Sequence, residues 1–200
     1  LDAQNVKLTG NQSIADEKEF TGLVKITDRL DLNDALNNTF IGRESGNSNG
    51  SGARNTSLGY QSLYSNTDGA YNIAIGSQSL YLNTVGYGNT SLGNESLSGN
   101  TSGFYNLGLG QSAGKRIANG TTPNETGSNS IFIGQNTRAN ADGETNQIVI
   151  GDTAIGEGSN KVVLGNNSIT DTYLKGHIRG NGAATFASTV SATDGLFSGD

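Results

Sequence analysis

The sequence predicts an all-β protein, a parallel β-solenoid of about eight coils, and two observations carry this prediction. The first is a short phrase ending in an aliphatic residue and glycine, which returns throughout residues 38–168. Its glycines stand at positions 42, 59, 76, 93, 110, 134, 151 and 165, mostly 17 residues apart. The second is another glycine seven residues before the first in most repeats, at positions 52, 69, 86, 103, 127 and 158. A fixed period of this size is typical of a solenoid, whose coils bury their apolar surface only by stacking.

The two glycines of a repeat predict two corners in each coil. The arc that leads from the second glycine to the first keeps seven residues in most repeats, whereas the other arc varies in length. It is longest between Gly110 and Gly127, where residues 115–124 contain the only proline, Pro123. We expect these residues to project as a loop, because insertions in a rigid scaffold lie on its surface.

The phrase before each corner glycine predicts a short strand. Alternation along a strand places the residue directly before the glycine, always Leu or Ile, on one face. We expect these residues to form the core of the coil: Leu58, Ile75, Leu92, Leu109, Ile133, Ile150 and Leu164. The residue before each of them points the other way and carries no charge, as at Ser57, Ala74 and Phe132. We expect this second face to be buried against other copies of the chain in a homotrimer.

Two rows of asparagines accompany the strands. The first row stands four positions before the corner glycine: Asn38, Asn55, Asn72, Asn89 and Asn106. The second row is Asn66, Asn83 and Asn100. Asn tolerates the left-handed backbone of a corner, and its amide can bond to the identical amide above and below. We therefore expect the first row to form a structural ladder along the stack.

Composition excludes several classes of protein. The 200 residues include 30 glycines but one proline, which together with the strict period excludes collagen and a disordered linker. The net charge of −6 argues against nucleic acid as a partner. The sequence has no cysteine, so it forms no disulfide or thiolate metal site. No apolar run approaches 18 residues, and we expect no membrane insertion.

Charge and motifs divide the chain into three parts. Residues 1–35 carry eleven charged side chains, whereas residues 55–114 carry two. We predict a β-rich shaft segment over residues 1–35 and the repeat domain over residues 36–170. Residues 171–200 are predicted to form a neck and the start of a C-terminal stalk.

Two stretches resemble known families. Residues 8–22, LTGNQSIADEKEFTG, resemble the short shaft repeat of bacteriophage and prophage tail fibres. The repeats resemble the heads of YadA-type trimeric autotransporter adhesins, built from Asn-Ser-x-Ala-Ile-Gly phrases, and residues 72–76 and 129–134 match best. The resemblance implies a left-handed β-roll, a homotrimer and an extracellular place, in a virion tail fibre or a cell-surface appendage.

These resemblances favour a trimeric fibre segment for attachment to and recognition of a cell surface, with a glycan or protein receptor. The chain begins at Leu1 without methionine, which suggests a piece of a longer protein joined at its termini to other fibre segments or a baseplate. Two alternatives remain open: a bacterial surface adhesin of the trimeric autotransporter type, and a purely structural spacer in a fibre. An ice-binding role, prompted by threonines at positions 67, 84 and 101, is weak because the row ends after three coils.

Residues with catalytic or metal-binding chemistry are few. His177 is the only histidine, and we interpret it as a solvated residue of the stalk. Asp68 and Glu95 stand in different coils and on opposite arcs, unlike the paired carboxylates of a glycoside hydrolase. Four carboxylates match no calcium-loop spacing: Asp142, Glu144, Asp152 and Glu157. We expect no enzyme activity, no cofactor and no metal.

Aromatic residues recur with the period of the coils and predict axial rows on the longer arc or at its corner. They stand beside Asn, Gln, Ser and Thr, which suits weak multivalent recognition of glycans or proteins. The predicted loop adds two basic residues. The candidate receptor contacts are Tyr64, Tyr81, Tyr71, Tyr105, Tyr87, Phe104, Lys115 and Arg116. The alternative is that the rings only pack between coils or subunits.

Overall fold

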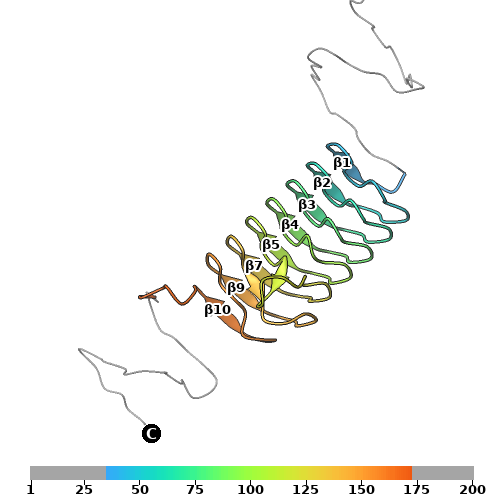
Figure 1. The fold of residues 1–200 in the computed structure, drawn as a ribbon. Coiled ribbons are helices and arrows are strands. Elements are labelled where there is room, and N and C mark those ends of the chain that lie inside the picture. The colour runs from blue at the N-terminus through green and yellow to red at the C-terminus, as the bar shows by residue number, and fades with distance from the viewer. Residues whose placement is uncertain (1–34, 173–200) are drawn as a thin grey trace, which may run out of the picture.

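Residues 35–172, the part of the chain that the computed structural model describes, form a parallel β-solenoid of about seven turns (Figure 1). The parallel, all-β architecture confirms that part of the predicted fold. Residues 35–172 contain no helix, and so none that is long and apolar enough to cross a membrane. The predicted shaft and most of the predicted neck and stalk, including His177, lie outside the described residues.

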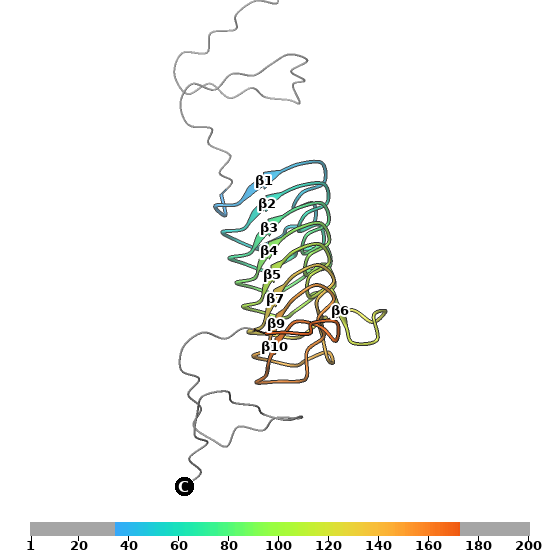
Figure 2. The same ribbon diagram turned by 90° about the vertical axis from the view of Figure 1, so that its left-hand side faces the viewer.

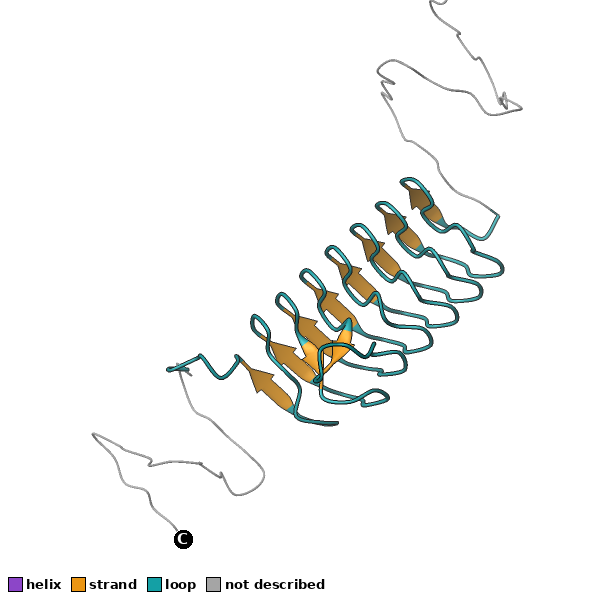
Figure 3. Cartoon of the chain, viewed as in Figure 1, coloured by secondary structure: helices purple, strands orange, loops and turns teal. Residues whose placement is uncertain are grey.

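Eight three-residue strands form one parallel sheet along the stack (Figure 3). In spatial order they are β1 (Thr39–Ile41), β2 (Thr56–Leu58), β3 (Ile73–Ile75), β4 (Thr90–Leu92), β5 (Leu107–Leu109), β7 (Ile131–Ile133), β9 (Ile148–Ile150) and β10 (Val162–Leu164). The register pairs Leu58 with Ile75 and Ile75 with Leu92. The aliphatic residues before the corner glycines therefore lie in a single file along the stack.

The longest arc projects from the side of the stack as a loop (Figure 2). It begins in β6 (Arg116–Ile117), which pairs with β8 (Arg138–Ala139) in a second, two-stranded parallel sheet. An antiparallel bridge between Arg116 and Pro123 closes the base of the loop. Residues 115–124 therefore lie outside the regular coil but remain attached to it at both ends.

The two faces of each strand are the reverse of the prediction. The middle residue points into the coil, and Ser57, Ala74 and Phe132 are fully buried. The residues before the corner glycines face outwards: Leu58, Leu92 and Leu109 are exposed, and so is Leu164, while Ile75, Ile133 and Ile150 are half-buried. The prediction that these seven residues form the core of the coil is therefore wrong.

The reversal follows from how the interior of the coil is filled. In the first four coils, residues six positions apart fill the interior together, and one is large where the other is small. Leu63 is fully buried in the coil of Ser57. Phe40 shares the first coil with Gly46, where an added Cβ would lie 2.5 Å from the Phe40 ring. The other buried pairs are Ala74 with Leu80 and Ser91 with Leu97. Where the opposite arc supplies a leucine, the strand supplies Ser57, Ala74 or Ser91 to the interior, and the aliphatic side chains of these strands face outwards.

The corners need glycine for two separate reasons, as Gly76 shows. Its φ of +130° is a backbone conformation that residues with a Cβ rarely adopt. A Cβ at this position would also lie 2.5 Å from the carbonyl oxygen of Gly93 in the next coil. The strict recurrence of glycine therefore reflects both the turn and the close stacking of the coils.

The first asparagine row is buried and joins the coils by hydrogen bonds. The backbone N–H of Asn72 donates to Oδ1 of Asn55 at 2.9 Å, and the backbone N–H of Asn89 donates to Oδ1 of Asn72 at 3.0 Å. Each side-chain amide also reaches a glycine carbonyl, as from Asn72 Nδ2 to Gly86 at 2.9 Å. The main partner of each amide is thus the backbone rather than the neighbouring amide.

The second asparagine row carries shorter bonds between amides than the first row, in which two such bonds occur at 3.2 Å. Asn83 Nδ2 donates to Asn66 Oδ1 at 2.9 Å, and Asn100 Nδ2 donates to Asn83 Oδ1 at 2.8 Å. Asn66 in turn donates to Asn49 Oδ1 at 2.7 Å. Two buried polar files therefore run parallel to the stack and hold the coils in register.

Candidate functional site

The outer face of the eight-stranded sheet is an exposed, uncharged surface, which we call the sheet face. It consists of the first and third residue of each strand: Thr39, Ile41, Thr56, Leu58, Ile73, Ile75, Thr90, Leu92, Leu107, Leu109, Ile131, Ile133, Ile148, Ile150, Val162 and Leu164. The exposed fractions of Leu58, Leu92 and Leu164 are 45%, 44% and 51%. Exposed surfaces with several Leu and Ile side chains in a row are typical of interaction sites.

Four of the candidate receptor contacts lie at the corners just before the strands, in a group that we call the aromatic corner. The rings of Tyr87 and Phe104 are stacked with centroids 5.1 Å apart. Tyr105 meets both of them edge-on, at 5.1 and 5.7 Å. Tyr71 is exposed, and the Arg54 guanidinium lies 5.2 Å from the centre of its ring. The aromatic corner therefore combines packing between coils with exposed ring surface.

The remaining candidate contacts lie on the side of the projecting loop. Tyr64 and Tyr81 are half-buried and stacked, with ring centroids 5.2 Å apart and an angle of 16° between the rings. Tyr81 also faces the region of Lys115 and Arg116, because all three line one hollow. The structure therefore brings Tyr81 together with the two basic residues and leaves the aromatic corner as a separate group.

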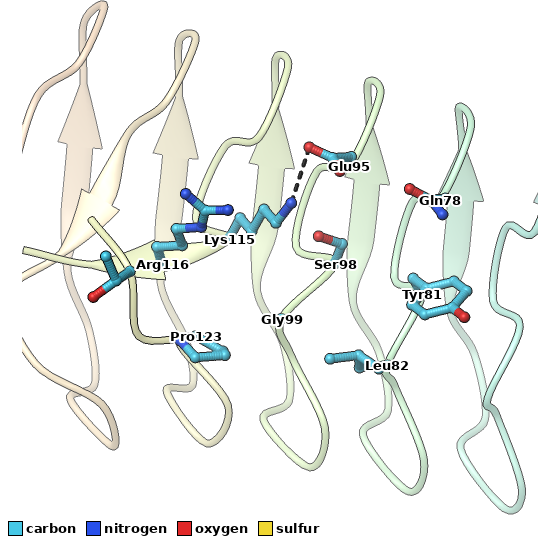
Figure 4. A pocket seen from close by; sticks show the side chains of 10 residues that line it. Gln78, Tyr81, Leu82, Glu95, Ser98, Gly99, Lys115, Arg116 and Pro123 are labelled. Atoms are coloured by element: carbon cyan, nitrogen blue, oxygen red, sulfur yellow. Dashed lines mark ion pairs between the residues drawn. The ribbon is translucent and has the colours of Figure 1, made fainter. Parts of the chain in front are cut away.

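The hollow beside the loop has a volume of about 260 Å³ (Figure 4). Tyr81, Leu82 and Pro123 line it with apolar surface, and Glu95 and Lys115 line it with charge. Tyr81 and Leu82 come from the arc of one coil and Pro123 comes from the loop, so the hollow exists only where the loop meets the stack. We call it the loop hollow.

An ion pair crosses the polar wall of the loop hollow. Lys115 Nζ lies 2.9 Å from Glu95 Oε2, and Ser112 Oγ donates to the same oxygen at 3.2 Å. The hydrogen bond from Lys115 holds the pKa of Glu95 below its ordinary value, although partial burial opposes this effect. Glu95 is therefore a carboxylate that positions Lys115.

A second hollow of about 290 Å³ adjoins the first and shares Glu95, Lys115 and Arg116 with it. Arg138 adds a third basic side chain, and the rest of its lining is mostly polar. Arg116 Nη1 donates to the Gly120 carbonyl at 2.9 Å, which holds the guanidinium at the base of the loop. We call this second space the basic hollow.

The other carboxylates have structural partners. Asp68 accepts a hydrogen bond from the Ser51 hydroxyl, which lowers its pKa. Burial raises the pKa of Asp142, but backbone N–H donors from Thr126 and Glu125 at 2.8 and 2.7 Å outweigh it, and the pKa lies below its ordinary value. Within residues 35–172 no three His, Cys, Asp or Glu side chains come close enough to hold a metal ion.

Sequence reasoning missed two parts of the loop hollow. Glu95 was weighed only as a catalytic carboxylate, because its contact with Lys115 spans the boundary between two coils. Leu82 and Ser98 carried no signal of their own, since isolated Leu and Ser residues are common on either arc. The 17-residue period could have shown that residues 78, 95 and 112 occupy equivalent positions in successive coils. Glu95 is therefore expected beside residue 112, three residues before Lys115.

Comparison of the chain with known protein families, curated proteins and solved structures gave no match. The fold and the surfaces alone therefore define its class: a β-solenoid repeat protein with an exposed sheet face on one side and a charged, partly apolar hollow beside a projecting loop.

Proposed function

We propose that the chain is a non-catalytic, trimeric fibre segment that attaches to and recognises a cell surface, as part of a phage tail fibre. The observation that carries this proposal is the sheet face, which continues over eight strands without a charged side chain. Large uncharged surfaces with exposed Leu and Ile are unfavourable in water and are normally covered by a partner. Further copies of the same chain are the partner whose surface matches along the whole length.

Burial of the sheet face is large enough to hold copies together. If each chain buries about 500 Å² of apolar surface, the gain is about 12 kcal/mol before the costs of association. Each strand is three residues long, or about 10 Å, so the face is narrow enough to meet two neighbours around an axis parallel to the stack. Cyclic closure with three copies would leave none of the faces exposed.

The resemblance of the repeats to trimeric adhesin heads supports three copies and a left-handed sense of the coils. In such a trimer the loop would remain on the outside, where an extracellular glycan or protein could reach it. A bacterial surface adhesin would have the same arrangement. A purely structural spacer is favoured by the two asparagine files, because they stiffen the column without creating a binding site.

The test of the trimer is the mass of the full chain in solution. Sedimentation equilibrium should give three times the chain mass of 20.6 kDa. Leu58→Asp with Leu92→Asp should yield a smaller species, because both changes place charge in the buried face. Val85→Asp is the matched control, since Val85 is also exposed but lies outside the strands. A stable, folded monomer of the unaltered chain would exclude the proposal.

The test of attachment is binding of the labelled trimer to whole bacterial cells. A fibre segment with a recognition role should bind some cell types and not others. A trimer that binds no cell type tested would favour the spacer.

A further inference from the structure

We propose that the loop hollow and the basic hollow together bind an acidic saccharide unit, with the sugar ring in the first and its carboxylate in the second. This inference rests on the proposed role in cell-surface recognition and names the chemistry of the receptor. It depends on three features of the described residues: the two-sided lining of the loop hollow, the local excess of basic side chains, and a buried hydroxyl without a partner.

The loop hollow has an apolar side and a polar side (Figure 4). Leu82, Pro123 and the ring of Tyr81 form the apolar side, and Glu95 with Lys115 forms the polar side. A pyranose ring has the same division, because its C–H groups form apolar faces and its hydroxyls form a polar rim. A volume of about 260 Å³ can hold one such ring but is too small to accept the surface of a folded protein partner.

Tyr81 is held in place before any ligand arrives. Its ring is stacked on Tyr64 with 5.2 Å between the centroids. A ring fixed in this way loses little conformational freedom on binding, which favours affinity.

The charge around the two hollows favours an acidic group. Residues 35–172 contain nine acidic side chains and six basic ones, which are Arg43, Arg54, Lys115, Arg116, Arg138 and Lys161. Three of these six line the two hollows, and Glu95 is the one acidic side chain that lines them. The pair of hollows thus carries a net positive charge in a chain whose net charge is −6. A carboxylate is the matching group, because guanidinium donors bind it in a two-pronged geometry.

A buried hydroxyl at the loop hollow points to the same conclusion. Ser98 lines this hollow, is only 5% exposed, and its Oγ has no hydrogen-bond partner. Buried polar groups without a partner are rare, and each calls for an explanation such as a missing ligand or water. Figure 4 shows the Ser98 side chain among the residues that line the hollow, so its hydroxyl lies at the wall that a sugar would contact.

The test is isothermal titration calorimetry of the full chain with soluble oligosaccharides. The probes are oligomers of galacturonate, mannuronate and hyaluronate, with methyl-esterified oligogalacturonate and dextran oligomers as neutral counterparts. At least one uronate oligomer should bind, and the neutral probes should bind at least about tenfold more weakly. If none of the uronates binds, or if neutral probes bind as well, the inference is overturned.

Two pairs of variants locate the site. Arg116→Gln should weaken binding by about tenfold, whereas Arg54→Gln removes the same charge at the aromatic corner and should leave binding unchanged. Leu82→Asp should abolish binding by placing a negative charge in the loop hollow, whereas Val85→Asp should not. Uronate binding that survives both Arg116→Gln and Leu82→Asp would place the saccharide elsewhere and refute this site.

Failure here is distinct from failure of the proposed function. A trimer that attaches to cells but ignores every uronate would refute the saccharide site alone. A monomer that attaches to no cells would refute the fibre segment, whatever saccharide it binds.

Discussion

Lys115 Nζ lies 2.9 Å from Glu95 Oε2, which joins the start of the projecting loop to the coil before it. Both side chains are partly exposed, at 20% and 33%, so solvent screens the pair and its contribution to stability is about 0.5–1 kcal/mol. Its main effect is therefore positional. It sets one wall of the loop hollow and keeps the loop against the stack.

Acid should weaken this attachment of the loop. The hydrogen bond from Lys115 lowers the pKa of Glu95 below 4.5. A carboxylate with a lowered pKa stabilises the folded state above its ordinary pKa, and this contribution is lost as the pH falls through the lowered value. The free energy of unfolding should therefore fall below about pH 4.5, and less so in Glu95→Gln. Chemical denaturation over this pH range measures the difference. Glu157→Gln is the control, and an equally steep loss in Glu95→Gln would contradict the prediction.

A Cβ at a corner glycine should be costly. Gly76→Ala combines an unfavourable φ with the close approach to the Gly93 carbonyl, and we expect a loss of more than about 3 kcal/mol in the free energy of unfolding. Gly143→Ala is the matched control, because its φ is +75° and an added Cβ would lie 3.3 Å from a flexible threonine hydroxyl. It should cost about 1 kcal/mol. Equal losses of unfolding free energy in the two variants would show that the close stacking of the corner glycines does not contribute to stability.

The first asparagine row should be sensitive to truncation. Asn72→Ala removes the acceptor of the Asn89 backbone N–H and the donor to the Gly86 carbonyl, and both remaining groups would be buried. We expect a loss of about 2–4 kcal/mol. Asn94→Ala, at an exposed asparagine, should cost less than about 0.5 kcal/mol. Urea denaturation at fixed protein concentration makes the comparison, and a cost for Asn72→Ala as small as that for Asn94→Ala would count against the row.

Substitutions of Tyr81 should distinguish a role in packing on Tyr64 from a role in ligand binding. Tyr81→Ala removes a half-buried ring that stacks on Tyr64. We expect the free energy of unfolding to fall by about 1–2 kcal/mol and uronate binding to weaken. Tyr81→Phe keeps the ring and should change the free energy of unfolding by less than about 0.5 kcal/mol. Thermal denaturation and the titration described above provide the two measurements. If Tyr81→Ala lowers stability but leaves uronate binding intact, Tyr81 has only a packing role.

The sequence predicted the parallel stack well, because the position of every corner glycine repeats with the coil. It did not predict which face of the strand is inside, because both faces lack charge and alternation alone does not distinguish them. The missing information lay in Leu63, Leu80 and Leu97, which fill the interior from the opposite arc. Their φ values are +55°, +50° and +46°, a conformation in which leucine is rare, so no sequence rule marks them.

The candidate site was only partly predictable for a related reason. Lys115 and Arg116 were identified from the length of their arc, which is a property of the sequence. Their neighbours Glu95 and Leu82 belong to earlier coils, and the contact depends on how far the loop folds back along the stack. Distances of this kind follow from the path of the loop, which the repeat period does not contain.

The two asparagine files and the glycine corners join each coil only to the coils directly above and below. Deleting one complete period, such as residues 59–75, would therefore bring together two surfaces that already match, and duplicating it would do the same. Gene duplication can thus lengthen or shorten the column in steps of about 4.8 Å while its cross-section is kept. Solenoids related in this way are expected to differ in length by whole coils, with the loop displaced along the stack as a unit.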